Sequence, residues 1–199
     1  MNLNKPMKRL SLYLLLLLFA LQTPSQADDI RDFQIEGISI GDSLLDYFDK
    51  EEIENFIYGD YYKDKTFTSV EYISQLDSKY EVIQIHFKTN DKKYIFFSID
   101  GGIKFKDNIK NCNKEKNKIS NEIEEIFKNL NKKEINTKMA SGHGTLSGIK
   151  FKFKSGDYIE VVCYDYYNEY TDETGFVDNL RVSMIRKELV EWIKYKAFK

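Results

Sequence analysis

Hydrophobic and polar residues alternate along several segments with the two-residue period of half-buried strands. Over residues 80–88, Ile83, Ile85 and Phe87 alternate with polar side chains, which places His86 on the outward, polar face. This pattern is typical of an antiparallel sheet that buries one of its faces. The same kind of pattern predicts further strands at 33–38, 70–73, 93–100, 103–105, 149–154, 159–164 and 180–186.

Other segments carry apolar residues three and four positions apart, the spacing of an amphipathic helix. The clearest of these is 113–130, which the pattern predicts to cover the sheet. Asp49 and Glu52 have the spacing of a capping box and predict a short helix after Asp49. Further helices are predicted after Ser43 and over 187–197. We therefore predict an α+β fold, an antiparallel sheet with helices packed on one face, in which a helix-plus-strands unit occurs twice.

Residues 1–27 have the pattern of a secretory signal peptide. Basic residues precede an apolar run from Leu10 to Leu21, which is too short to span a bilayer. Ser25 and Ala27 then supply the small residues of a cleavage site. We expect cleavage near Ala27, which leaves residues 28–199 as a single α+β domain that is periplasmic or secreted. The region has no cysteine at its exit, so we expect no lipid anchor.

Export changes the interpretation of the two cysteines, Cys112 and Cys163. In an oxidising compartment an isolated pair predicts a disulfide bond. Cys112 has no histidine near it in the sequence, and Cys163 lies in a strand pattern, so neither resembles an activated nucleophile. We predict a bridge that ties the start of the long helix to the strand that holds Cys163.

Composition narrows the class of partner. The chain has 30 basic and 32 acidic residues, and loss of residues 1–27 would remove only basic ones. A net acidic domain argues against a nucleic-acid partner, which favours a basic surface. No other apolar run reaches the roughly 20 residues that a membrane span requires. The aromatic content of 15% is sufficient for a well-packed core.

The loop 141–145 places His143 between two glycines. A glycine-rich loop can expose backbone amides to an anion, and a histidine can act as an acid or a base. The loop lacks the spacing of a phosphate-binding P-loop, so a plain connecting loop is the competing interpretation. A hydrolase-like enzyme that uses His143 stays as an alternative.

The segment 165–175 is acidic and aromatic. It lacks the alternation of an EF-hand loop, and we predict a solvated hairpin loop there. Exposed tyrosines favour binding surfaces. We therefore predict an interaction surface formed by Tyr61, Tyr62, Tyr166, Tyr167 and Tyr170.

Catalytic and cofactor motifs do not occur in the sequence. The nucleophile elbow, the zinc-binding His-Glu-x-x-His pair and the dinucleotide fingerprint are missing. With two histidines and both cysteines assigned to a bridge, a zinc site would need carboxylates to complete it. We predict no catalytic residue, metal or cofactor.

Three stretches carry a family resemblance: Ile38–Phe48, Ile109–Cys112 and Lys187–Ile193. They resemble small exported proteins of low-GC bacteria, a resemblance that implies no particular activity. The Ile-Gly-Asp-Ser sequence within the first stretch also resembles the start of outer-membrane assembly lipoproteins and β-lactamase-inhibitor-like folds. That resemblance implies small helix-on-antiparallel-sheet units. The chain departs from the lipoprotein pattern because it has no lipidated cysteine.

These observations favour a non-enzymatic binding or protein-interaction module in the periplasm, with an envelope protein as the expected partner. The alternatives are the small enzyme that uses His143 and an inhibitor-like module that acts on an exported enzyme. The sequence assigns neither the ligand nor the oligomeric state.

Overall fold

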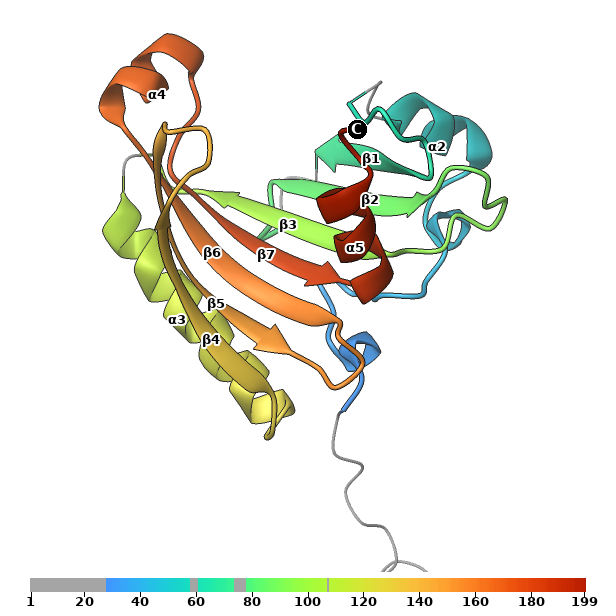
Figure 1. Cartoon of the computed structure of the whole chain (residues 1–199), viewed down its shortest axis with the longest axis horizontal. Helices are drawn as coiled ribbons and strands as arrows, with labels where there is room; N and C mark the ends of the chain where they lie inside the picture. Colours follow the sequence, from blue (N-terminus) through green and yellow to red (C-terminus); the bar gives the residue numbers. More distant parts are fainter. Residues whose placement is uncertain (1–27, 58–60, 74–77, 107) are drawn as a thin grey trace, which may run out of the picture.

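The computed structural model describes residues 28–57, 61–73, 78–106 and 108–199, and its central element is a seven-stranded antiparallel sheet (Figure 1). The strands are β1 (Phe67–Ile73), β2 (Val82–Lys88), β3 (Ser98–Lys104), β4 (Asn131–Lys138), β5 (Gly144–Lys152), β6 (Tyr158–Tyr166) and β7 (Asn179–Ile185). The α-helices are α2 (Lys50–Phe56), α3 (Ile109–Ile126), α4 (Asn168–Thr174) and α5 (Lys187–Tyr195). The predicted α+β class is confirmed. The predicted signal peptide, 1–27, lies outside the described residues.

The strand order is β1-β2-β3-β7-β6-β5-β4. Two runs of consecutive strands, β1 to β3 and β4 to β6, each pair in chain order, and each run follows a helix. β7 is added last and pairs with β3 on one side and β6 on the other. The final strand therefore joins the two halves of the sheet at its centre.

One face of the sheet is closed by the main hydrophobic core. α3 packs against β5, β6 and β7 with Ile119 and Ile123, and the N-terminal segment and α2 add apolar side chains to the same cluster, including Ile53. The sheet contributes alternate strand residues to this core, such as Ile83 and Val182, which are fully buried. We call this the α3 face. The period-two pattern of the strands explains why every second residue reaches this core.

The two cysteines meet within the α3 face. Cys112 lies in the first turn of α3 and Cys163 on β6, and their Cα atoms are 6.0 Å apart. The two sulfur atoms are at disulfide distance. The predicted pairing is confirmed, and it links the start of the long helix to a central strand as expected.

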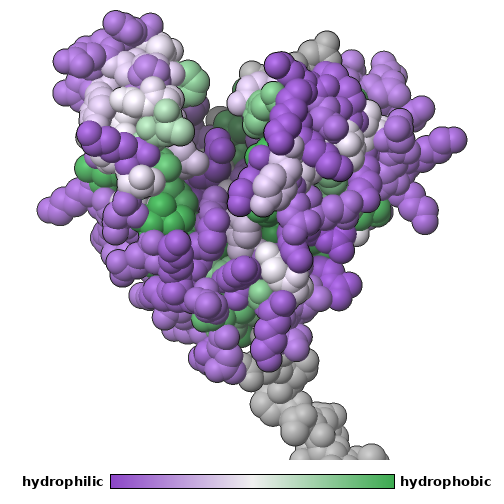
Figure 2. Space-filling model, viewed as in Figure 1, coloured by the Kyte–Doolittle hydropathy of each residue, from purple (hydrophilic) through white to green (hydrophobic). Residues whose placement is uncertain are grey.

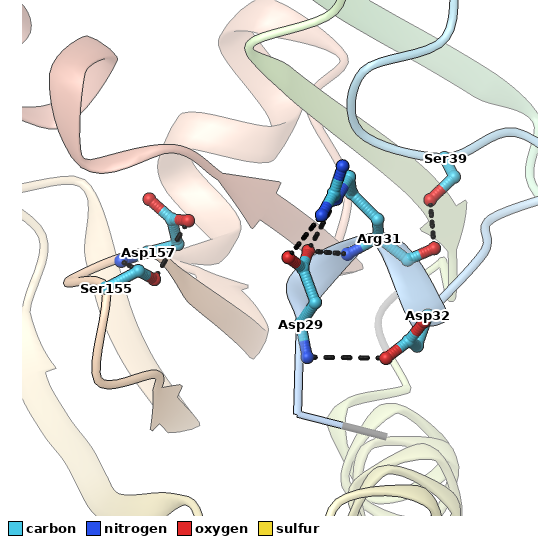
Figure 3. Close-up of polar contacts among 6 residues, drawn as sticks. All are labelled: Asp29, Arg31, Asp32, Ser39, Ser155 and Asp157. Carbon is cyan, nitrogen blue, oxygen red and sulfur yellow. Dashed lines mark hydrogen bonds and ion pairs between the residues drawn. The ribbon is translucent and has the colours of Figure 1, made fainter. Parts of the chain in front are cut away.

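The first described residues are held by a local polar cluster (Figure 3). Asp29 caps a short 3₁₀ helix, Ile30–Asp32, and its carboxylate accepts hydrogen bonds from the Arg31 guanidinium at 2.8 and 2.9 Å. The Ser39 hydroxyl donates to the Arg31 carbonyl at 2.7 Å. These contacts fix the start of the segment that carries Ile30 into the core.

The opposite face of the sheet is covered only in part. α5 packs at one end of it through a second cluster that contains Phe67, Phe97, Ile185, Leu189 and Trp192. Figure 1 shows α4 and α5 well apart, with α4 at the upper left of the view and α5 to the right of its centre. No helix of the described part of the chain covers the strand residues between them, and we call this side the groove face. The prediction placed all helices on one face of the sheet. α5 instead lies on the groove face, because its apolar residues belong to the second cluster.

Several local predictions need correction. The segment 33–38 is not a strand, because Glu36 and Gly37 adopt positive φ angles and turn the chain so that Ile35 and Ile38 form a single bridge. The segment 165–175 contains α4 rather than only a hairpin loop. β4 was not predicted, since nearly all of its residues are exposed and polar. The capping box of Asp49 and Glu52 at the start of α2 is confirmed.

Candidate functional site

The groove face contains a cleft between α4 and α5, which we call the groove. Figure 2 shows a hollow between the lobe that carries α4 and the lobe that carries α5. Two cavities make up the groove, one of about 360 Å³ toward α4 and one of about 420 Å³ toward α5. We call them the α4 half and the α5 half. Both are lined by Gln84, Asp100 and Arg181, so they are adjacent parts of one depression.

The floor of the groove follows from strand register. The residues that alternate with the core positions form a polar row across the whole sheet, one residue from each strand: Glu71, Gln84, Asp100, Ser183, Glu160, Lys150 and Lys133. Because side chains alternate between the faces, this row points away from the α3 face. Arg181 lies two residues along β7 from Ser183, opposite Gly102 on β3 and Val162 on β6.

A chain of hydrogen bonds runs through the α5 half. The Tyr62 hydroxyl lies 2.7 Å from His86 Nε2, and His86 Nδ1 lies 2.8 Å from Ser98 Oγ. Ser98 donates to one oxygen of Asp100, and Ser183 donates to the other. Since Ser98 uses its proton on Asp100, it accepts from Nδ1–H of His86, and Nε2 then accepts from Tyr62. The chain therefore runs in one direction and ends on the Asp100 carboxylate.

His86 is neutral within this chain of hydrogen bonds. Its side chain is buried, although the sequence pattern placed it on the outward face. Burial lowers the pKa of His86, and Arg181 adds to this effect against the opposing charge of Asp100. The cover over His86 comes from Tyr62, which packs against Trp192 of α5 with ring centroids 4.8 Å apart. A histidine on the polar side of a strand is thus buried by residues that are distant in sequence.

The geometry of these hydrogen bonds favours a structural role for the residues over a role in nucleophilic catalysis. An activated nucleophile needs a lowered pKa together with a neighbouring base. Burial, together with Tyr61 and Asp100, raises the pKa of Tyr62 to about 12, so its hydroxyl stays protonated. Ser98 stands between the histidine and the carboxylate and donates to the carboxylate, so it is not poised for attack. The hydroxyl, imidazole and carboxylate groups of this chain of hydrogen bonds are therefore bonded to one another.

Arg181 is different, because its donors are unused. It is exposed within the groove and its guanidinium lies 5.4 Å from the centre of the Tyr164 ring. Among the described residues it makes no hydrogen bond and no ion pair. Desolvation in the groove disfavours the charged form of Arg181 and lowers its pKa. Electrostatic interactions with neighbouring groups, led by Tyr164 and Asp100, are stronger in sum and raise the pKa of Arg181. The groove therefore holds a permanent cation whose hydrogen-bonding capacity is free.

Three other charged groups of the floor, Asp100, Glu160 and Lys150, are already engaged. Glu160 pairs with Lys150 at 2.9 Å, and Lys150 also lies 3.8 Å from the centre of the Tyr158 ring. Asp100 accepts from two serine hydroxyls. Arg181 is therefore the cation at the junction of the two halves that a ligand can engage without breaking a hydrogen bond or ion pair.

The predicted tyrosines are divided between the two sides of the groove. Tyr61 and Tyr62 line the α5 half, and both rings contact Phe198, at centroid distances of 5.7 and 5.6 Å. Tyr166 and Tyr170 lie on the α4 side, and Tyr167 precedes α4 as its cap residue. The five tyrosines thus form two groups rather than one continuous patch, and Tyr166, Tyr167 and Tyr170 are not among the described residues that line the groove.

His143 stands apart from the groove. It is exposed, and its ring stacks on Tyr170 with centroids 4.1 Å apart and planes 10° from parallel. Among the described residues that line the two halves of the groove, His143 does not occur. Its stacking partner gives it a packing role at the tip of the β4–β5 connection, next to α4.

Sequence reasoning missed the residues at the centre of the groove. Arg181 interrupts the apolar run of β7 between Leu180 and Val182, and that charged position in a buried strand was the available signal. Asp100 and Gly102 lie in the middle of β3, but nothing local in the sequence indicates that β7 lies beside them. The site is assembled by pairing between strands that are about 80 residues apart.

Together the fold and the site define an α+β protein with a ligand-sized groove across the open face of its sheet. Comparisons of this chain with known protein families, curated proteins and solved structures found no match. Within the described ranges, His, Cys, Asp and Glu side chains form no group of three that could hold a metal ion. None of the helices in the described part of the chain is both long enough and apolar enough to cross a membrane.

Proposed function

We propose that this chain is an exported binding protein without catalytic activity, and that its groove takes up a small ligand. The observation that carries the proposal is the position of Arg181, a charged side chain with free donors at the junction of the two cavities. Small-molecule sites combine a concave, largely apolar lining with a few polar groups that orient the ligand. Each half of the groove has a volume in the range of such sites.

Export is part of the same proposal. The pattern of residues 1–27 supports a secreted or periplasmic location, and the paired cysteines suit an oxidising compartment. A soluble binder in that compartment meets solutes and envelope components. The polar floor with its aromatic walls fits a solute better than a flat protein surface, because the recognition groups lie at the bottom of a depression.

Gly102 offers a way to block the groove without replacing any of its charged groups. A Cβ atom at Gly102 would meet only Val82 atoms, at 3.8 and 3.9 Å, which is ordinary contact. Gly102 also lines the α4 half and lies opposite Arg181. A Gly102→Leu side chain should therefore fill the α4 half while the strand keeps its pairing. Since a glycine in a strand interior contributes no packing, the variant should be at least as stable as the wild type.

The test is equilibrium dialysis of the purified protein against a low-molecular-weight extract of bacterial periplasm, followed by mass spectrometry of retained compounds. We expect the wild type to retain a compound that Gly102→Leu does not retain. The matched control is Ser141→Leu, which adds the same side chain at an exposed turn away from the groove. Equal retention by wild type and Gly102→Leu, or no retention by the wild type, would contradict a binding function for the groove.

A further inference from the structure

We propose that the ligand is a small organic acid with one carboxylate, which Arg181 binds, and a flat apolar body that lies in the α4 half of the groove. This inference rests on the proposed function and names the ligand class for the same site.

The carboxylate follows from the state of Arg181. A guanidinium presents planar donors that match a carboxylate in a two-point, charge-assisted arrangement. Tyr164 is the aromatic partner of the Arg181 guanidinium, at 5.4 Å, and such ring contacts leave the N–H donors at its edge available. Since the described residues supply no acceptor for these donors, they are available to an anion that enters the groove.

The surrounding charge decides which kind of anion fits. Asp100 and Glu160 both act on Arg181 electrostatically, and of these only Glu160 has its own cation, Lys150. His86 is neutral and supplies no compensating charge. A doubly charged phosphate would bring a second negative charge next to Asp100, where like charges repel. A singly charged carboxylate satisfies Arg181 without that cost.

The apolar body follows from the lining of the α4 half. Val82 and Ile103 lie on the sheet side, and Phe176 and Val177 lie on the other side, on the chain that leaves α4. Gly175 ends α4 in the left-handed conformation, with φ of 74°, and so turns the chain toward the groove. Phe176 is 54% exposed although it is one of the largest apolar side chains of this wall. A flat ring in this half would cover Phe176 and rest on the open position at Gly102.

The test uses three probes that share one apolar body: 3-phenylpropanoate, 3-phenylpropanamide and 3-phenylpropyl phosphate, each titrated into the purified protein at pH 8 and followed by NMR chemical-shift changes. We expect the carboxylate to bind at least about tenfold more tightly than either the amide or the dianionic phosphate. Arg181→Gln should weaken carboxylate binding at least about tenfold, because it removes the charge and the paired donors. Arg181→Lys keeps the charge but not the planar fork. Its affinity for the carboxylate should therefore lie between that of the wild type and that of Arg181→Gln.

Gly102→Leu separates this inference from the proposed function. It should abolish binding of the carboxylate while Arg181 stays in place, which assigns the apolar body to the α4 half. If the three probes bind alike, or if Arg181→Gln binds the carboxylate as the wild type does, the ligand class is wrong. If no probe binds but the dialysis experiment still finds a compound that Gly102→Leu loses, the ligand class fails and the binding function stands. If both experiments find nothing, both proposals fail.

Discussion

The two faces of the sheet are built from the same strands but do different things. On the α3 face, alternate residues such as Ile83 and Val182 are fully buried beneath α3 and the N-terminal segment. On the groove face, their immediate neighbours Gln84 and Arg181 line an open depression. One face is closed by apolar packing and the other is closed only at its ends. The comparison suggests that stability resides mainly in the first face and binding capacity in the second.

The polar face is ordered without being apolar. Tyr62, His86, Ser98 and Ser183 satisfy one another in a chain that ends on Asp100. Buried polar groups that are fully hydrogen-bonded hold side chains in fixed positions. Arg181 can therefore remain unpaired in a rigid setting, which is favourable for a ligand because little ordering is left to be done on binding. Three predictions test this division.

The largest effect is expected from the disulfide of the α3 face. Cys112 and Cys163 are 51 residues apart, and opening a loop of that length should lower the free energy of unfolding by about 4 kcal/mol on the chain-entropy model. The measurement is urea unfolding with and without reductant. A Cys112→Ala/Cys163→Ala double variant serves as the control, since reductant should not change its midpoint. Equal midpoints of the oxidised and reduced wild type would show that the bridge does not constrain the unfolded chain.

A somewhat smaller effect is expected from a single core residue, and here the faces can be compared within one strand. Ile83→Ala should lower the free energy of unfolding by about 3 kcal/mol, because it leaves a cavity in the closed core. Gln84→Ala, one residue further on β2, is the matched control and should change it by less than about 0.5 kcal/mol. Urea midpoints of the two variants measure the difference. Similar losses for both would mean that the groove face contributes to stability as the α3 face does.

The sequence predicted the α3 face better than the groove face for a physical reason. The alternation of Ile83, Ile85 and Phe87 is a local pattern, and the single cysteine pair leaves one pairing to choose. The α+β class and the bridge followed from these local signals and are confirmed. The groove depends instead on β7 entering between β3 and β6, which no local pattern encodes.

Two residues illustrate what was missed. His86 occupies a polar strand position, but residues from the C-terminal helix and Tyr62 cover it, so it is buried rather than exposed. Arg181 was predicted only as part of a closing strand, and its role depends on Asp100 and Tyr164 from two other strands. The predicted tyrosines do border the groove at Tyr61 and Tyr62, while His143 lies outside its lining. Residue type thus pointed to two tyrosines of the α5 half, whereas the floor depends on the strand register.

The smallest effect is a pH dependence that comes from the groove face. His86 faces Tyr62, Asp100 and Arg181, and burial lowers its pKa below the ordinary value of 6.5. Above pH 6.5 the imidazole is neutral in both the folded and the unfolded chain, so it adds no pH dependence. As the pH falls below 6.5, the unfolded chain takes up a proton that the folded chain does not. The free energy of unfolding should therefore fall by roughly 1 kcal/mol per pH unit from this group until the folded pKa is reached.

The measurement is urea unfolding of the wild type and of His86→Gln between pH 8 and pH 5, and the quantity of interest is the difference between their slopes. Carboxylates contribute to both proteins and cancel, so the remaining slope belongs to His86. A wild type without this extra slope would mean that the folded His86 takes up a proton over the same pH range as the unfolded chain. Both of its nitrogens would then donate, Tyr62 would have to accept, and the hydrogen-bond direction derived from Ser98 and Asp100 would be reversed at that end. A His86 that is charged at low pH would also add a second positive charge near Arg181 on the groove floor.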